Sequence, residues 1–199
     1  SPPGRVEPSM EAEPAPQFGE LELSGVFYRY ANYDTPFWAR PNTQPGRWHS
    51  PGSPPMQYLS SSSDAAWAEL IRAENLRDER AVSLVRMPMW RARIREARIV
   101  DCGTPASARA AGIDPDALID DDHSACQEVG RVLRKAGVRG VIAPSAALPG
   151  QQVIVLFGPR LAVGWDAQPK LASAVPASIV GVGAPPPGLV DRVRLRGDQ

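Results

Sequence analysis

The chain has 199 residues, of which 43% are hydrophobic, and this composition indicates one globular domain that buries its own core. Its 22 basic and 22 acidic residues give a formal net charge of zero, so it lacks the excess positive charge that direct binding of nucleic acid requires. No apolar run approaches the roughly 20 residues that span a bilayer, which argues against a membrane protein.

Residues 1–20 are rich in proline and glutamate and carry little apolar pattern, so we expect a disordered lead. This segment has no basic region followed by an apolar one, and it therefore does not predict a signal peptide. The two cysteines have neither disulfide nor metal spacing, and we expect them to be buried in a reducing compartment. The sequence therefore predicts a cytoplasmic protein without a metal site.

Apolar and aromatic residues predict a β-strand at 21–30, and a second, short strand follows at 56–60. The segment 32–55 between them holds many prolines, which exclude regular structure. It also carries Phe37 and Trp48, and a flexible linker would not use aromatic residues in this way. We therefore expect a long ordered loop that builds a pocket.

A run of serines before Asp64 offers an N-cap for a helix over about 65–80. On that helix Glu69 has alanines as its helical neighbours, and such small side chains let a ligand approach the carboxylate. The remaining elements alternate in type: strands at 81–89, 97–102, 138–143 and 153–157, with helical segments between 104 and 136.

Residues 168–199 are rich in alanine and proline and indicate a C-terminal extension, in which 189–196 could add an edge strand. The alternation of helices and strands in the rest of the chain predicts the α+β class.

Seven residues could carry chemistry, although each alone is more often structural. They are two arginines, three aromatic residues, one carboxylate and one serine: Arg29, Arg47, Tyr30, Trp48, Tyr58, Glu69 and Ser145. Two arginines suit the binding of phosphate groups, and aromatic faces suit a nicotinamide ring. One carboxylate can bind a ribose hydroxyl and stabilise positive charge on the sugar. The combination points to cleavage of an N-glycosidic bond in a dinucleotide.

The order of these motifs resembles the RES domain family, which is named for its arginine, glutamate and serine. The matching pieces are FYRY (27–30), GRWHSPG (46–52), MQYLSSSSDAAWAE (56–69), DDDHSACQEVG (120–130) and GVRGVIAPSA (137–146). The resemblance spans about residues 24–165 and makes 21–167 the expected RES catalytic domain.

The resemblance implies a fold similar to the ADP-ribosyltransferase core, a split β-sheet with flanking helices. It implies a toxin that cleaves the nicotinamide–ribose bond of NAD and depletes NAD by phosphorolysis or hydrolysis. NAD is then the substrate, inorganic phosphate is a possible co-substrate, and no further cofactor is needed. It also implies an antitoxin partner of the Xre-type helix-turn-helix class, and it leaves a homodimer open.

Carried over residue by residue, the resemblance makes Arg29 and Arg47 the arginines that hold phosphates, of NAD or of the incoming anion. Tyr30 and Tyr58 are expected to pack on nicotinamide and its ribose, and Trp48 is placed in the same NAD-binding set.

The resemblance implies that Glu69 binds a ribose hydroxyl and stabilises the oxocarbenium-like state. It implies that Ser145 orients a substrate group or a neighbouring side chain. The loop departs from the family's Gly-Gly-Arg-Trp-Asn pattern at Pro45 and His49, which leaves the acceptor open among water, phosphate and a protein side chain. Two alternatives therefore stay open: an ADP-ribosyltransferase that modifies a protein target, and an inactive RES-fold binding module.

Overall fold

The computed structural model describes residues 18–34, 36–163 and 173–198. In chain order its elements are β1 (Glu20–Tyr30), β2 (Met56–Ser60), α1 (Ser63–Ala73), α2 (Glu79–Ser83), β3 (Met87–Asp101), α3 (Pro105–Ala110), α4 (Ser124–Lys135), β4 (Gly140–Pro144), β5 (Gln152–Phe157), β6 (Arg160–Ala162), β7 (Ser173–Val175), β8 (Ala177–Gly183) and the 3-10 helix η1 (Val190–Arg192). The predicted α+β class is confirmed.

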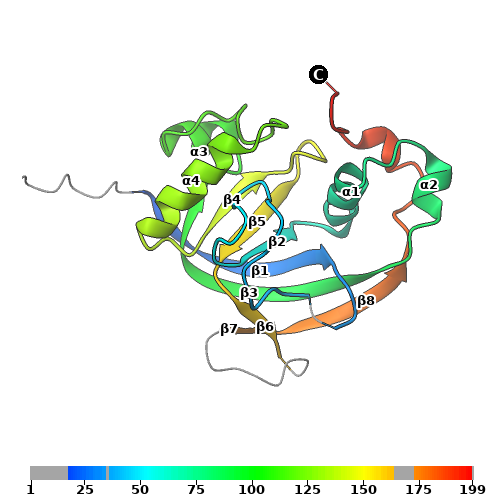
Figure 1. Ribbon diagram of the computed structural model, residues 1–199, viewed down its shortest axis with the longest axis horizontal. Helices are drawn as coiled ribbons and strands as arrows, with labels where there is room; N and C mark the ends of the chain where they lie inside the picture. Colours follow the sequence, from blue (N-terminus) through cyan, green and yellow to red (C-terminus); the bar gives the residue numbers. More distant parts are fainter. Residues whose placement is uncertain (1–17, 35, 164–172, 199) are drawn as a thin grey trace, which may run out of the picture.

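Six strands form one mixed sheet in the order β1-β2-β5-β4-β3-β8, and β1 also pairs with β3. The antiparallel β1–β3 pairing extends along most of β1, whereas β1 meets β2 only at Tyr28 and Ser60. Strand β3 meets β4 only over residues 99–101. The sheet is therefore split into two halves, β1-β3-β8 and β2-β5-β4, which Figure 1 shows crossing one another.

Helix α1 begins where the serine run predicts, because the Ser62 hydroxyl accepts a hydrogen bond from the Ala65 N–H at 3.1 Å. The helix ends at Ala73, earlier than the predicted residue 80, since Asn75 adopts a left-handed backbone with φ of 49°. Its apolar stripe, which includes Ile71, is buried in a core cluster under the C-terminal segment.

Strand β3 corrects the predicted strands at 81–89 and 97–102, because it is one continuous strand that begins at Met87. Residues 81–83 belong instead to α2, whose N-cap Asp78 accepts a hydrogen bond from the Ala81 N–H at 2.8 Å. The strand continues through the middle, where buried and exposed residues alternate: Ala92 and Ile94 are buried, whereas Arg91, Arg93 and Arg95 are exposed.

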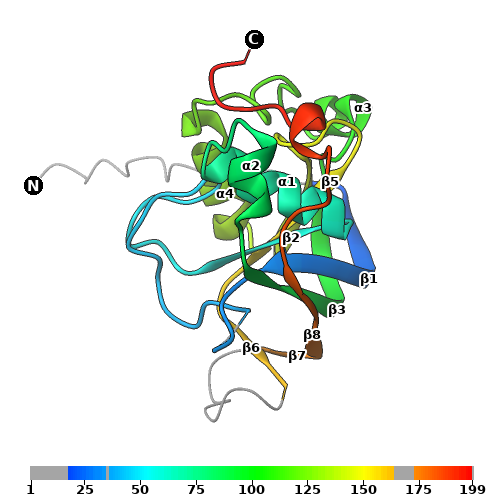
Figure 2. The same ribbon diagram turned by 90° about the vertical axis from the view of Figure 1, so that its right-hand side faces the viewer.

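The C-terminal part of the chain adds a strand to the sheet and a segment that packs on α1. The edge strand is β8, which pairs with β3, whereas the predicted strand at 189–196 is wrong because this segment includes η1. The segment, red in Figure 2, lies beside α1. Its apolar side chains belong to the same core cluster as those of α1: Leu189, Val190, Val193 and Leu195. Residues 173–198 are therefore part of the folded core rather than an appended extension.

At the other end of the chain, residues 1–17 of the predicted lead lie outside the described residues. Phe18 packs against a core cluster and Glu20 begins β1, so the folded part starts before residue 20. Both cysteines are buried free thiols, as predicted. Within the described ranges, no helix has the length and apolar character needed to cross a membrane.

Candidate active site

A cavity of about 630 Å³ is lined by residues of β1, β2, α1 and the loop that joins the two strands. Five of the seven predicted site residues line it: Arg29, Tyr30, Arg47, Tyr58 and Glu69. The loop contributes Phe37 and Trp38 beside its arginine, so the expectation that it builds a pocket is confirmed for its described residues.

Glu69 is placed in the cavity by α1 and held from behind by Ser145. The Ser145 hydroxyl donates a hydrogen bond to Glu69 Oε1 at 2.7 Å. The serine oxygen in turn accepts from the N–H groups of Ala147 and Leu148, at 3.2 and 3.0 Å. Ser145 therefore uses its only hydrogen on the carboxylate and both lone pairs on backbone donors. This arrangement makes it a positioning residue rather than a nucleophile.

Burial raises the pKa of the Glu69 carboxyl above its ordinary value. The hydrogen bond from Ser145 and the positive charge of Arg47 act in the opposite direction, because both favour the ionised carboxylate. A carboxyl group balanced in this way responds to a positive charge brought in by a ligand. Small neighbours on the helix, including Ala66 and Ala73, also line the cavity, so nothing bulky screens the carboxylate on that side.

Arg29 brings a buried cation to the cavity from β1. Among the described residues its Nη1 atom is buried without a hydrogen-bond partner, and its guanidinium carbon lies 6.0 Å from the centre of the Trp38 ring. Desolvation lowers the pKa of Arg29 to about 10, which still leaves it charged at neutral pH. A buried N–H group without an acceptor, on a cavity wall, is a place for an anionic ligand.

Arg47 reaches the cavity from the loop and is fixed by the segment before α4. Its Nη1 donates to the carbonyl oxygens of Leu118 and Asp120, at 3.3 and 2.6 Å. Burial raises the pKa of both Glu69 and Tyr58, and the charge of Arg47 opposes this rise because it favours the ionised form of each group. The two predicted arginines and the glutamate therefore share one cavity.

Tyr58 on β2 is held at its hydroxyl by the loop. The hydroxyl accepts from the Trp48 N–H at 3.1 Å and lies 2.7 Å from His49 Nδ1. His49 Nε2 faces the Gln44 carbonyl oxygen at 3.1 Å, and because a carbonyl only accepts, Nε2 carries the proton and Nδ1 accepts from the tyrosine. Burial lowers the pKa of His49, which favours this neutral form. His49 therefore orients Tyr58.

Tyr30 lines the cavity two residues after Tyr28 on β1, and burial together with the charge of Glu69 raises the pKa of its hydroxyl. Trp48, which was predicted to be part of the NAD-binding set, does not line the cavity. Its side chain is only 1% exposed and lies in the core cluster that α4 covers, so it cannot touch a ligand in the cavity. The backbone N–H of Trp48, which holds Tyr58, is its contribution to the site.

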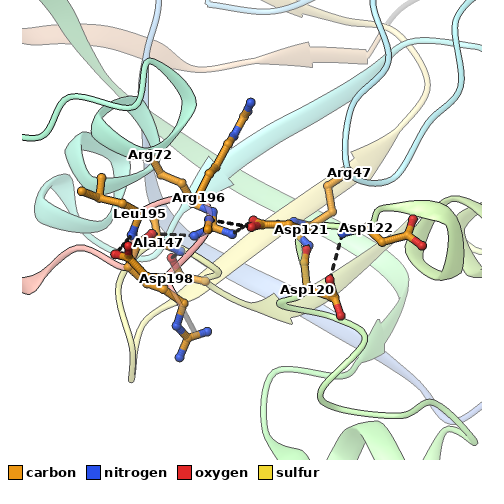
Figure 3. Close-up of polar contacts among 12 residues, drawn as sticks. Arg47, Arg72, Asp120, Asp121, Asp122, Ala147, Leu195, Arg196 and Asp198 are labelled. Carbon is orange, nitrogen blue, oxygen red and sulfur yellow. Dashed lines mark hydrogen bonds and ion pairs between the residues drawn. The ribbon is translucent and has the colours of Figure 1, made fainter.

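Sequence reasoning missed three cavity residues: Arg72, His123 and Arg196. Arg72 could have been found, because it follows Glu69 by three residues and therefore lies on the same face of α1. His123 comes from the segment before α4, and Arg196 comes from the C-terminal segment. Figure 3 shows the ion pair between Arg72 and Asp121, with Arg47 on the segment before α4 and Arg196 on the C-terminal segment beside it. No sequence pattern places these distant segments together.

Comparisons with known proteins identify the family of the chain and proteins that are similar to it. The family model for the RES domain matches residues 25–175. The chain is 30% identical over 125 residues to the probable NAD(+) phosphorylase Rv3189 of Mycobacterium tuberculosis, which covers 60% of this chain and 56% of that protein. It is 29% identical over 132 residues to the NAD(+) phosphorylase MbcT of Mycobacterium bovis, which covers 64% of this chain and 71% of that protein.

Among solved structures, the crystal structure of the M. tuberculosis MbcT-MbcA toxin-antitoxin complex matches with a TM-score of 0.58. The match covers 88% of this chain and 92% of that chain at 24% identity, and this likeness shows the fold. The match to Rv3189, the first of the two sequence relatives, spans little more than half the length of that protein.

Proposed function

The chain belongs to the RES domain family, and on this premise we propose that it depletes NAD as a phosphorylase. It breaks the nicotinamide–ribose bond of NAD and transfers ADP-ribose to inorganic phosphate, the activity that the names of its relatives at 30% and 29% identity state. The observation that carries the proposal is the Glu69 carboxylate, which faces the cavity and is held there by the 2.7 Å hydrogen bond from Ser145.

The other cavity residues fit the parts of NAD. Arg29 offers an unsatisfied N–H group to a phosphate, and Arg47 adds a second charge on the same wall. Tyr30 and Tyr58 present aromatic faces for nicotinamide and its ribose. Because the Tyr58 hydroxyl is already bonded to the loop, this residue acts through the position of its ring.

In the proposed reaction a phosphate oxygen attacks the ribose carbon that bears nicotinamide. The carbon–nitrogen bond breaks as the new carbon–oxygen bond forms, and its electron pair neutralises the positively charged pyridinium ring. Nicotinamide leaves as a neutral molecule, and the other product is ADP-ribose-1″-phosphate. Positive charge develops on the ribose during this exchange, and the Glu69 carboxylate stabilises it while binding a ribose hydroxyl.

The raised pKa of Glu69 suits a site that receives a cation. In the empty cavity burial disfavours the carboxylate, but the nicotinamide ring of NAD carries a positive charge that favours it. Binding of NAD therefore promotes the ionised form of Glu69 that the transition state needs. Neutral nicotinamide lacks this charge and is held less tightly after the bond breaks.

We further propose that the chain acts as a toxin kept in check by an antitoxin, since a protein that depletes NAD must be restrained in its own cell. The support is the structural likeness to the toxin-antitoxin complex. The finer proposals come from the family resemblance: an Xre-type helix-turn-helix antitoxin as the partner and the cytoplasm, where NAD is abundant, as the location.

The test is to incubate the purified chain with NAD and to identify the products by mass spectrometry, with and without inorganic phosphate. We expect nicotinamide and ADP-ribose-1″-phosphate when phosphate is present. Glu69→Gln keeps the size of the side chain but loses its charge, so turnover should fall by about a hundredfold or more. Glu74→Gln, an exposed glutamate just after the same helix, is the matched control and should leave turnover unchanged.

Four outcomes would contradict the proposal in different ways. Free ADP-ribose alone in the presence of phosphate would make the enzyme a hydrolase. ADP-ribose attached to a protein would make it an ADP-ribosyltransferase. Intact NAD with a folded chain would leave the cavity as a binding site, and full activity in Glu69→Gln would remove the role given to this carboxylate.

A further inference from the structure

The cavity holds more positive charge than the predicted site explains. Four arginines line it against two carboxylates, although the chain as a whole is neutral. Two of these arginines, Arg72 and Arg196, have no part in the roles assigned above. They meet the segment before α4 beside Asp121 and Arg47, as Figure 3 shows.

Arg72 anchors the C-terminal segment to the cavity wall. Its Nη1 donates to the Arg194 carbonyl oxygen and its Nη2 to Asp121 Oδ1, both at 2.5 Å. The second oxygen of Asp121 accepts from the Gly197 N–H at 2.8 Å. One oxygen of Asp121 is therefore held by Arg72 and the other by a backbone donor, and among the described residues Arg196 makes no hydrogen bond or ion pair with this carboxylate.

The backbone on both sides of Arg196 is fixed. The Arg196 carbonyl oxygen accepts from Arg77 Nη2 at 2.8 Å, and the Arg194 N–H donates to the Ala147 carbonyl oxygen at 2.8 Å. The side chain of Leu195 is buried against α1. These contacts hold the segment in one place, so Arg196 extends from a rigid support.

The guanidinium of Arg196, by contrast, has no hydrogen bond or salt bridge within residues 18–34, 36–163 and 173–198, yet it lines the cavity. His123, which lies in the same wall, has its pKa lowered first by burial and then by the charges of Arg47, Arg196 and Arg72. The charges of three arginines thus act on one histidine, and Arg196 is the member of this group whose side chain donates no hydrogen bond within the described part of the chain.

We propose that Arg196 binds a phosphate group of the substrates, and that the C-terminal segment serves to deliver it. The proposal rests on the proposed NAD phosphorylase function and adds a binding residue to the same site. Residue 196 lies beyond the match to the family model, which ends at residue 175, so the family assignment says nothing of it. Arg72 acts as a positioning residue because its own donors hold the segment.

Arg196 and Glu69 line the same cavity, and this shared position fits the chemistry. In NAD the phosphate next to the nicotinamide ribose is a few bonds from the reacting carbon, and the attacking inorganic phosphate must approach that carbon directly. A phosphate group of either substrate must therefore enter the cavity that Arg196 lines.

The test compares Arg196→Gln with the wild type in two assays. Isothermal titration with inorganic phosphate and with ADP-ribose measures binding without turnover, and steady-state kinetics measures KM for phosphate and for NAD. We expect one of these ligands to lose affinity by about tenfold or more, the scale of a charge-assisted hydrogen bond, while kcat changes little. Arg196→Lys keeps the charge without the planar fork and should fall in between.

The two sources of the phosphate group give different results. If Arg196 holds the attacking anion, the KM for phosphate rises, the KM for NAD stays, and more free ADP-ribose is formed. If it holds the diphosphate of NAD, the KM for NAD and the dissociation constant of ADP-ribose rise together. Either pattern supports the assignment and names the ligand.

Arg192→Gln is the matched control, because Arg192 is an exposed arginine of the same segment that does not line the cavity. The proposal is overturned if Arg196→Gln leaves all four constants unchanged, or if Arg192→Gln alters them to the same extent. A wild-type chain that does not turn over NAD would remove the proposed function, whereas the titrations would still decide whether Arg196 binds a phosphate group.

Discussion

At the scale of single residues, the pair Glu69–Ser145 sets the chemistry of the site. A serine beside a carboxylate suggests a nucleophile, but here the hydroxyl hydrogen is donated to Glu69 and two backbone N–H groups occupy the oxygen. The pair therefore works in the opposite direction: the hydroxyl stabilises the negative charge of Glu69. Removing it leaves the carboxylate in place with one fewer donor, and its pKa must rise.

Ser145→Ala should therefore shift the pH dependence of kcat/KM. The acidic limb reports the pKa of the free enzyme's Glu69, which burial already places above its ordinary value, and the substitution moves this limb to still higher pH. Activity is lost first on the acidic side because the carboxylate is protonated there. The measurement is a pH series with Ser178→Ala, an exposed serine on β8, as control. An unchanged acidic limb would show that Ser145 does not tune Glu69.

At the scale of elements, the loop between β1 and β2 works as a holder for Tyr58. Gly46 and His49 form an isolated antiparallel bridge, with the Gly46 N–H donating to the His49 carbonyl oxygen at 2.9 Å. The Gly46 carbonyl oxygen in turn accepts from Gln127 Nε2 of α4 at 2.9 Å. The loop is thereby fixed to the body of the protein, which explains how a proline-rich segment can carry Arg47 into a defined cavity.

Gly46→Ala should damage the site more than the fold. A Cβ atom at residue 46 would lie 2.7 Å from His49 Nδ1 and 2.8 Å from the Tyr58 hydroxyl, so both side chains would have to move. A displacement of about 1 Å at such a site reduces turnover by as much as a hundredfold. NAD turnover and thermal unfolding should be measured together with Gly181→Ala, where the added atom meets open space. Equal activity in both variants would contradict the role given to the loop.

The elements also show what a sequence can predict. The unit β2–α1 follows directly from the chain, because a short apolar strand, a serine cap and a helix with alanines beside Glu69 are all local signals. The same holds for the order of the motifs that carry Arg29 and Tyr58. Strand β3 was predicted as two pieces because its middle carries exposed arginines. That these arginines lie on the solvent-facing side of one strand becomes clear only from the pairing of β3 with β1.

At the scale of the whole molecule, the site depends on contacts between distant parts of the chain. The family resemblance placed Trp48 in the NAD-binding set, but its side chain is buried in a core cluster with residues of α4. No local pattern in the sequence reveals that this helix covers it. Arg196 was not predicted at all, because its segment is held at the cavity by hydrogen bonds with Arg72 and Asp121. Both cases involve partners far apart in sequence, so composition and periodicity carry no signal for them.

The C-terminal segment links stability to the site, and a pair of leucines can test this. Leu195 is 8% exposed in the core cluster with α1, whereas Leu84 is 72% exposed. Leu195→Ala should lower the free energy of unfolding by about 2 kcal/mol or more, because a buried leucine is truncated. Leu84→Ala should change it by less than about 0.5 kcal/mol.

Denaturant unfolding measures both leucine variants, and titration with inorganic phosphate and with ADP-ribose measures what the segment does for the cavity. Because Leu195 fixes the backbone next to Arg196, its truncation should also weaken the binding of the ligand that loses affinity in Arg196→Gln, whereas Arg196→Gln should weaken binding without loss of stability. If Leu195→Ala unfolds like the wild type, the segment is not part of the core. If it is destabilised but binds both ligands normally, the segment stabilises the fold without positioning Arg196.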